Sequence, residues 1–225
     1  MMADVIFDRV AAYYDSWYKT DLGNVVDQVE RALAQRMFQT SGKQVLEVGC
    51  GTGQYTPWLV KEGYEVTAVD ISREMMAKAQ AKFPAIGAKV HWWQADITDI
   101  IDQLGKFHGI FGMTTFEFIS RPEWALSKLY ACLEQGGCLL IGVIAGNSPW
   151  SEFYQENARQ KPASVYARAQ FYTEKEIRHW KIGGRLEIGK SLFFSPDVDT
   201  IAEALALEER QEGRAGFIVA KWVKD

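Results

Sequence analysis

The sequence predicts an α/β protein built on one parallel sheet with helices on both faces. Two observations support this prediction. Apolar runs rich in β-forming residues alternate along the chain with segments that bear helix-capping signals. The runs are nearly continuous in their apolar character, which is typical of strands buried on both faces. Because each helix returns the chain to the same edge of the sheet, neighbouring strands are expected to run parallel.

Five apolar runs are the expected strands. The first ends in a glycine, and the second and third each end in an aspartate. In an open parallel sheet, ligands bind at the carboxyl ends of the strands, so the residues that end these runs are candidates for a site. The runs are 43–49, 64–70, 88–96, 107–113 and 137–145.

Helices are expected between the runs, where capping residues and glycines mark their ends. Ser120 and Glu123 have the spacing of a capping box, as do Thr173 and Glu176 later in the chain. The expected helices are 57–62 before Gly63, 73–83 after Ser72, one or two turns in 97–106, 124–135 before Gly136 and Gly137, and two that open at Ser148–Pro149 and Thr173.

Length and composition fit one globular domain spanning 1–225. Apolar residues make up 48% and charged residues 24% of the 225 residues. The net charge of −4 disfavours a partner rich in phosphates, so no nucleic acid is expected. The sequence shows neither a signal peptide pattern nor an apolar run of ~18 residues. We therefore expect no membrane span and a cytoplasmic location.

Three glycines, Gly49, Gly51 and Gly53, follow the first expected strand. The dinucleotide fingerprint GxGxxG would need a glycine at position 54, which is Gln54. Two residues before the first glycine stands Glu47, whose carboxylate would repel a pyrophosphate and suit an ammonium or sulfonium centre. This local charge favours a cationic cofactor.

Aspartates end the next two strands. Asp70 stands 21 positions after Gly49, where a carboxylate can accept hydrogen bonds from both ribose hydroxyls of any adenosine cofactor, NAD included. Asp96 can accept from an adenine amino group, and Ile97 could lie against the ring. Together with the glycines, these acids predict an adenosine-binding edge.

The strings VLEVGCGTG (45–53), VTAVDIS (66–72) and WWQADI (92–97) resemble the class I S-adenosylmethionine-dependent methyltransferases over roughly residues 43–143. FDRVAAYYDSWY (7–18) is similar to the opening of small-molecule methyltransferases of ubiquinone and menaquinone biosynthesis. The resemblance implies a Rossmann-like, seven-stranded, mostly parallel sheet whose last strand is antiparallel. Residues 186–194 and 216–222 would form strands six and seven, with a helix in 199–211.

The resemblance also implies S-adenosyl-L-methionine as cofactor, S-adenosyl-L-homocysteine as product, and direct in-line transfer to a small-molecule acceptor. The glycine turn and Glu47 would surround the methionine moiety, and Thr114 and Thr115 would border cofactor and substrate. The residues expected at the cofactor are Tyr18, Glu47, Gly49, Cys50, Gly51, Gly53, Asp70, Ile71, Met75, Asp96, Ile97 and Thr114.

The domain is expected to divide into four segments with different roles. Residues 1–40 would form a helical lid that uses Tyr13, Tyr14, Trp17 and Tyr18, and 43–145 the cofactor-binding core. Residues 146–185, aromatic and interleaved with cations, would cap a planar or carboxylated acceptor, and 186–225 would supply the last strands. Helical aromatics are equally typical of a core. The acceptor-site candidates are Tyr14, Glu117, Trp150, Tyr154 and Arg168.

Several chemistries are disfavoured. Residues 113–118 read MTTFEF where methyltransferases of DNA-base or glutamine amino groups carry an Asn/Asp-Pro-Pro-aromatic motif. Glu117 is the single acid there, so no metal is predicted. Glu117, Tyr14 and His179 stay open as general bases. A nicotinamide-dependent oxidoreductase and a non-catalytic S-adenosylmethionine binder are the alternatives, and the acceptor, methylated atom and oligomeric state stay open.

Overall fold

The computed structural model describes residues 5–84 and 89–225. Residues 1–4 of the expected lid and Ala88 of the expected third strand lie outside the described residues. Within the described parts, no helix combines the length and the apolar character that crossing a bilayer requires.

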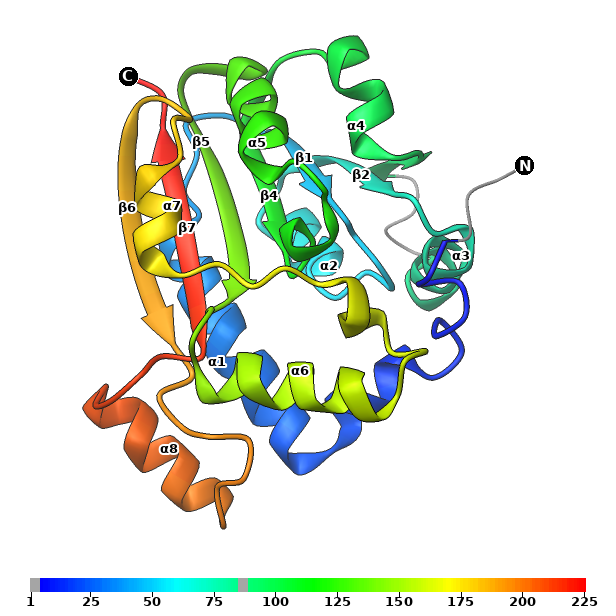
Figure 1. The fold of residues 1–225 in the computed structure, drawn as a ribbon. Coiled ribbons are helices and arrows are strands. Elements are labelled where there is room, and N and C mark those ends of the chain that lie inside the picture. Colours follow the sequence, from blue (N-terminus) through cyan, green and yellow to red (C-terminus); the bar gives the residue numbers. More distant parts are fainter. Residues whose placement is uncertain (1–4, 85–88) are drawn as a thin grey trace.

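Seven strands form one sheet in the order β3-β2-β1-β4-β5-β7-β6 (Figure 1). The first five strands pair in parallel, whereas β7 runs antiparallel to both β5 and β6. The predicted seven-stranded, mostly parallel sheet with an antiparallel last strand is therefore confirmed. The strands are β1 (Gln44–Val48), β2 (Glu65–Asp70), β3 (Val90–Gln94), β4 (Phe107–Met113), β5 (Leu133–Ile144), β6 (Arg185–Ser191) and β7 (Phe217–Val223).

Helices cover both faces because successive side chains of each strand point to opposite sides. Val45 belongs to the core beneath α1 and α2, and its neighbour Leu46 to the core beneath α4 and α5. The helices are α1 (Asp21–Met37), α2 (Thr56–Lys61), α3 (Arg73–Lys82), α4 (Ile97–Ile100), α5 (Pro122–Ala131), α6 (Pro149–Gln160), α7 (Glu174–His179) and α8 (Ile201–Arg210), with short 3-10 turns η1 (Tyr14–Lys19), η3 (Ile101–Gln103), η4 (Phe116–Phe118) and η5 (Val165–Arg168).

The predicted capping box at Ser120 is wrong. Arg121 is the N-cap of α5, and Pro122 occupies its first turn, where a residue without an N–H group leaves no helix donor unpaired. Glu123 instead accepts a hydrogen bond from the Lys181 N–H at 2.9 Å. The helix also ends earlier than predicted, at Ala131, because β5 begins at Leu133 to pair with β4.

The other predicted caps are confirmed. The Ser72 hydroxyl accepts from the Met75 N–H at 3.1 Å at the start of α3. Thr173 and Glu176 form a reciprocal capping box at the start of α7.

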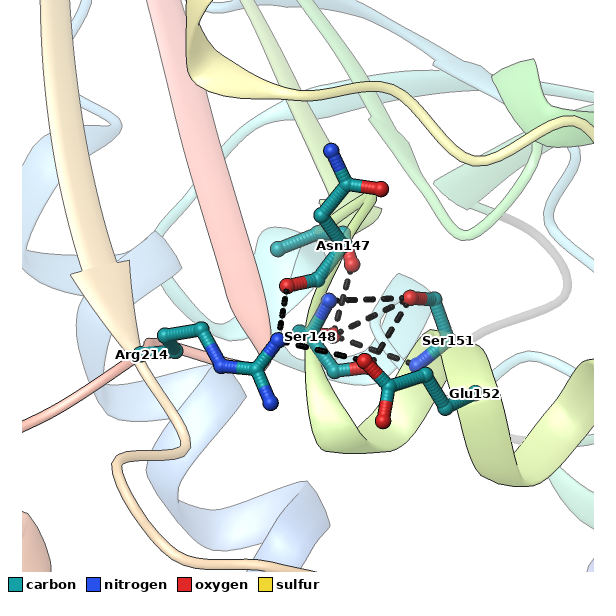
Figure 2. A network of polar contacts seen from close by, with 6 residues as sticks. Asn147, Ser148, Ser151, Glu152 and Arg214 are labelled. Atoms are coloured by element: carbon teal, nitrogen blue, oxygen red, sulfur yellow. Dashed lines mark hydrogen bonds and ion pairs between the residues drawn. The ribbon is translucent and has the colours of Figure 1, made fainter.

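The start of α6 is fixed by a polar network (Figure 2). Ser148 and Ser151 form a capping box, in which each hydroxyl accepts from the other residue's N–H at 3.1 and 3.0 Å. From the segment before β7, the Arg214 guanidinium donates to the Asn147 carbonyl at 2.9 Å and pairs with Glu152 at 3.1 Å. The network thus joins the chain before β7 to the helix that crosses the carboxyl ends of β4 and β5 (Figure 1).

Candidate functional site

A cavity of about 240 Å³ lies at the carboxyl ends of the first four strands, where the strand order reverses between β1 and β4. Open parallel sheets bind ligands at this place. The predicted site residues that line it are Tyr14, Gly49, Gly51, Asp70, Ile71, Met75, Asp96, Ile97 and Thr114.

The glycine turn forms one wall of the cavity. Gly49 and Gly51 have φ angles of +70° and +52°, a left-handed conformation that side chains disfavour. A Cβ atom on Gly49 would lie 2.1 Å from the Thr115 hydroxyl, whereas one on Gly51 would meet nothing within 4 Å. Gly49 therefore allows close packing, and Gly51 leaves open space.

Asp70 ties this turn to the next helix. Its two carboxylate oxygens accept from the Gly51 N–H at 2.7 Å and from the Ser72 N–H at 2.8 Å. Burial raises the pKa of Asp70, although these two N–H groups oppose the rise. Each oxygen has a second lone-pair direction, so the carboxylate can still accept from a ligand.

Asp96 presents a carboxylate oxygen at the end of β3. Its Oδ1 caps α4 by accepting from the Thr98 N–H at 2.8 Å and the Thr98 hydroxyl at 2.7 Å. No residue in the described ranges donates to Oδ2. Ile97 follows it, and Ile71, 38% exposed, lines the same cavity. An acceptor oxygen beside apolar side chains suits an aromatic ring that carries an amino group.

The end of β4 closes the cavity on another side. Thr114 has a φ angle of +47°, which is unusual for a β-branched residue and costs backbone strain. Its N–H donates to the Gly142 carbonyl at 2.8 Å, which fixes this conformation. The Thr115 hydroxyl donates to the Met113 carbonyl at 3.0 Å. The strained turn therefore places both threonines against the glycine turn.

Glu47, Cys50 and Gly53 are buried behind the glycine turn and do not line the cavity. The Glu47 carboxylate accepts from the Thr56 hydroxyl at 2.7 Å at the start of α2. Burial raises the pKa of Glu47 to about 8. A pKa this high favours the neutral carboxyl group near pH 7, so Glu47 lies beside the turn without adding a charge to the cavity wall.

Residues 5–19 cover the cavity, and two aspartates of this segment fasten it through polar contacts. Asp8 accepts from the Ser72 hydroxyl at 2.5 Å. Asp15 accepts from the Thr52 hydroxyl at 2.6 Å and pairs with Lys82 at 2.6 Å. Burial alone would raise the pKa of Asp15, but the hydrogen bonds from Lys82 and Thr52 outweigh it and lower the pKa.

Within this covering segment, the expected long lid helix is replaced by a turn-rich stretch and the short η1. Phe7 and Tyr14 line the cavity from it. Tyr13 is 61% exposed, and neither it nor Tyr18 lines the cavity. Phe7, Phe118 and Ile119 also line the cavity, and no sequence pattern predicts them, because only the folded packing brings these residues together.

The remaining acceptor-site candidates lie beyond the cavity lining. Trp150 is 1% exposed, and its indole N–H donates to the Phe194 carbonyl at 2.7 Å. Tyr154 stacks on Tyr166 with ring centroids 4.1 Å apart. Arg168 is exposed at the end of η5. Glu117 is buried in η4, two residues after Thr115.

The histidines lie away from the cavity. His91 is exposed in β3, His108 stands near the start of β4 at the opposite edge of the sheet, and His179 ends α7. Among residues 5–84 and 89–225, no group of three or more His, Cys, Asp or Glu side chains could hold a metal ion.

Known proteins similar to this chain include methyltransferases. Residues 45–137 match a family model described as a methyltransferase domain. This match covers most of the part of the sheet that lines the cavity, from β1 to the start of β5. The fold of the chain is similar to that of a Thermotoga maritima S-adenosylmethionine-dependent methyltransferase, titled a possible histamine N-methyltransferase, with a TM-score of 0.75, 21% identity and 98% of both chains covered.

Sequence relatives include named methyltransferases. A putative methyltransferase of a Geobacillus species is 30% identical over 56% of this chain, which spans about half (54%) of that relative's length. A ubiquinone biosynthesis O-methyltransferase of Xanthomonas axonopodis is 24% identical over 84% of both chains. The methyltransferase resemblance, including that to ubiquinone biosynthesis enzymes, is thereby confirmed.

Proposed function

We propose that this chain transfers a methyl group from S-adenosyl-L-methionine to a small-molecule acceptor by direct in-line displacement. One observation supports this most strongly. Two carboxylates, those of Asp70 and Asp96, line the cavity, and no lysine, arginine or histidine among the described residues lines it. A cavity with this charge attracts a sulfonium cofactor and repels a diphosphate.

The cavity fits an adenosine group. Asp70 would accept hydrogen bonds from the ribose hydroxyls through the lone pairs that the two backbone N–H groups leave free. The Oδ2 atom of Asp96 would accept from the adenine amino group. Ile71 and Ile97 would pack on the ring, and Met75 would lie near the adenosine. Gly51 leaves the open space that a methionine chain needs.

When bound, S-adenosyl-L-methionine supplies an electrophilic methyl group on a positively charged sulfur, and S-adenosyl-L-homocysteine is left. The chain's contribution would be to hold the reactants in line, which can be worth about 7–11 kcal/mol. The covering segment, through Phe7 and Tyr14, would exclude water from the transfer. Glu47, Cys50, Gly53 and Tyr18 would support the glycine turn and the cavity wall from behind.

The nicotinamide alternative is disfavoured by the hydrogen bonds of the turn. Dinucleotide sites use free N–H groups of the first turn to hold the pyrophosphate. Here the N–H groups of Gly49 and Cys50 donate to the Val69 carbonyl, that of Gly51 donates to Asp70, and that of Gly53 donates to the Cys50 carbonyl. These donors are already used within the protein.

We further propose that 1–225 acts as a single unit, with 146–185 as the acceptor cap over the core. The relatives' names support a small acceptor, since one names ubiquinone biosynthesis and one structural neighbour's title names histamine. The single seven-stranded sheet, which includes strands from both ends of the chain, supports the single unit.

The test is transfer of a radiolabelled methyl group to a panel of quinols, phenols, amines and carboxylates. We expect at least one class to become labelled, and Asp96→Ala to reduce labelling by weakening cofactor binding. Asp99→Asn, an exposed acid of α4, is the matched control. If S-adenosyl-L-homocysteine binds but no acceptor is labelled, the non-catalytic binder replaces this proposal.

A further inference from the structure

Beside the cavity lies a group of aromatic and acidic side chains, here named the tyrosine cluster. Its members come from five elements in separate parts of the chain: η1 and α1 near the start, η4 in the middle, and α6 and η5 after β5. The rings of Tyr14 and Tyr18 lie 5.9 Å apart, and those of Tyr154 and Tyr166 stack at 4.1 Å. The cluster comprises Tyr14, Tyr18, Tyr154, Tyr166, Glu30 and Glu117.

The tyrosine cluster is continuous with the cavity. Tyr14 belongs to the cavity wall. Phe118, another wall residue, has its ring 6.2 Å from that of Tyr166. Glu117 directly precedes Phe118 in η4 and follows the cavity residues Thr114 and Thr115. A ligand at the end of the cavity would therefore meet Tyr14 and Phe118, with the Tyr166 ring packed near Phe118 and Glu117 next to Phe118 in the chain.

Glu117 is a buried acid that the protein satisfies only in part. It is 1% exposed. Its Oε1 accepts from the Ile144 N–H at 2.9 Å, while its Oε2 is buried without any hydrogen-bond partner. An unpartnered buried carboxylate oxygen is costly, and burial raises the pKa of Glu117 to about 7. Burial is the main cause that raises the phenol pKa of Tyr14, Tyr154 and Tyr166, and the charge of Glu117 makes a smaller contribution to each rise.

The cluster has no cation of its own. Within the described ranges, neither Glu30 nor Glu117 forms an ion pair. Arg31, next to Glu30, pairs with Asp27 at 2.8 Å and donates to the Gln54 carbonyl at 2.8 Å. Burial raises the pKa of Glu30 well above its usual value, and the nearby Asp27 and Glu117 carboxylates add to the rise. A positive charge from outside would relieve both acids.

We propose that the methyl acceptor is a small amine, bound as an ammonium ion where the cavity meets the tyrosine cluster, with Glu117 as its counter-ion and proton acceptor. Tyrosine faces attract cations, most strongly where water is excluded. The Glu117 carboxylate, whose Oε2 has no partner among the described residues, disfavours a carboxylate or phosphate acceptor. This inference rests on the proposed function.

The proton balance of the step is simple. The ammonium ion gives one proton to the Glu117 carboxylate, and the nitrogen keeps the lone pair. That pair forms the new nitrogen–carbon bond to the methyl group, while the electrons of the carbon–sulfur bond stay on sulfur. The product leaves as a methylated ammonium ion, and Glu117 returns its proton to water. No further reactant is needed.

The test compares three probes that share one ring but differ in charge: 2-phenylethylamine, 2-phenylethanol and 3-phenylpropionate. Tetramethylammonium serves as a cation that cannot accept a methyl group. Calorimetry first measures binding of S-adenosyl-L-homocysteine, and then binding of each probe to the protein saturated with it. We expect both cations to bind at least tenfold tighter than the neutral and anionic probes, and labelled methyl to pass to the amine.

Variants separate the role of Glu117 from a structural one. Glu117→Gln keeps an oxygen for the Ile144 N–H, so the protein should fold and bind S-adenosyl-L-homocysteine normally. Affinity for 2-phenylethylamine should fall about tenfold to a hundredfold, as expected for a lost charged hydrogen bond, and affinity for tetramethylammonium should fall through the lost counter-charge. Tyr154→Phe keeps a ring and should bind cations nearly normally, whereas Tyr154→Leu should not. Glu134→Gln, an exposed acid of β5, is the control.

A second readout is proton release, measured by calorimetry in two buffers of different ionisation enthalpy near neutral pH. Tetramethylammonium should displace a proton from Glu117, since a nearby cation favours its charged form, and Glu117→Gln should abolish the release. The other groups that face Glu117 are Glu30 and the phenols of Tyr14, Tyr154, Tyr166 and Tyr172.

The outcomes distinguish the two proposals. If S-adenosyl-L-homocysteine does not bind, the proposed function fails first. If it binds and the neutral or anionic probe binds tighter than the amine, the amine proposal is overturned and the methyltransferase proposal stands. Equal tetramethylammonium affinity in the wild type and in Glu117→Gln would likewise overturn it.

Discussion

Replacing Asp70 with asparagine should weaken binding of S-adenosyl-L-homocysteine about tenfold to a hundredfold. The carboxylate has two roles in the structure, since it holds the Gly51 and Ser72 N–H groups and faces the cavity. Asparagine keeps one acceptor oxygen and replaces the other with a donor. A hydrogen bond to a charged group is worth about 1.5–3 kcal/mol, and 1.4 kcal/mol is about a factor of ten in affinity.

The same substitution should lower the free energy of unfolding by about 1–3 kcal/mol, because one of the two backbone N–H groups loses its acceptor. Calorimetry gives the affinity, and urea denaturation without ligand gives the stability. Asp99→Asn, an exposed acid of α4, is the control and should change neither. If Asp70→Asn loses stability and yet binds S-adenosyl-L-homocysteine as tightly as the wild type, the carboxylate holds the turn and does not contact the ligand.

Three further predictions concern the turn, the buried acid behind it and the covering segment. Gly51→Ala should lower the free energy of unfolding by about 1–2 kcal/mol, because Gly51 has a positive φ. Gly49→Ala should lower it more, because the added Cβ would also lie 2.1 Å from the Thr115 hydroxyl. Equal losses of stability for the two variants in urea denaturation would contradict this. The pKa of Glu47 is about 8 in the folded chain against an ordinary value of 4.5, so the folded state binds more protons between these values and stability should fall as pH rises through this window. Glu47→Gln should reduce this slope of the unfolding free energy by about 1 kcal/mol per pH unit. An unchanged slope would rule out the burial of Glu47 as its cause. Asp15→Ala removes the contacts to Thr52 and Lys82 and should speed S-adenosyl-L-homocysteine release several-fold in stopped-flow experiments, whereas an unchanged rate would mean that the segment does not gate the cavity.

Strand-end chemistry could be predicted from the sequence because it depends on local order. Parallel strands bring their carboxyl ends to one edge, so Gly49, Asp70 and Asp96 had to lie near one another once the strands were assigned. The cavity lining includes all three. The position of Glu47 was harder to predict, because a strand residue's distance from the site depends on which face it points to.

The tyrosine cluster could not be predicted in the same way. Tyr14, Tyr154 and Tyr166 come from 3-10 turns and a helix whose positions depend on tertiary packing, and Glu30 showed no motif. The start of α6 was predicted from Ser148 and Pro149, but its contacts with Arg214, more than 60 residues away in the chain, could not be. The predicted start of α5 was wrong for a local reason. Pro122 occupies the first turn, so that Arg121 and not Ser120 is the N-cap.

The most direct test of the central claim is a pair of calorimetric titrations of the purified protein, one with S-adenosyl-L-homocysteine and one with NADH. The acidic, cation-free lining of the cavity and the occupied N–H groups of the glycine turn predict binding of the first and none of the second. Binding of NADH without S-adenosyl-L-homocysteine would contradict the account.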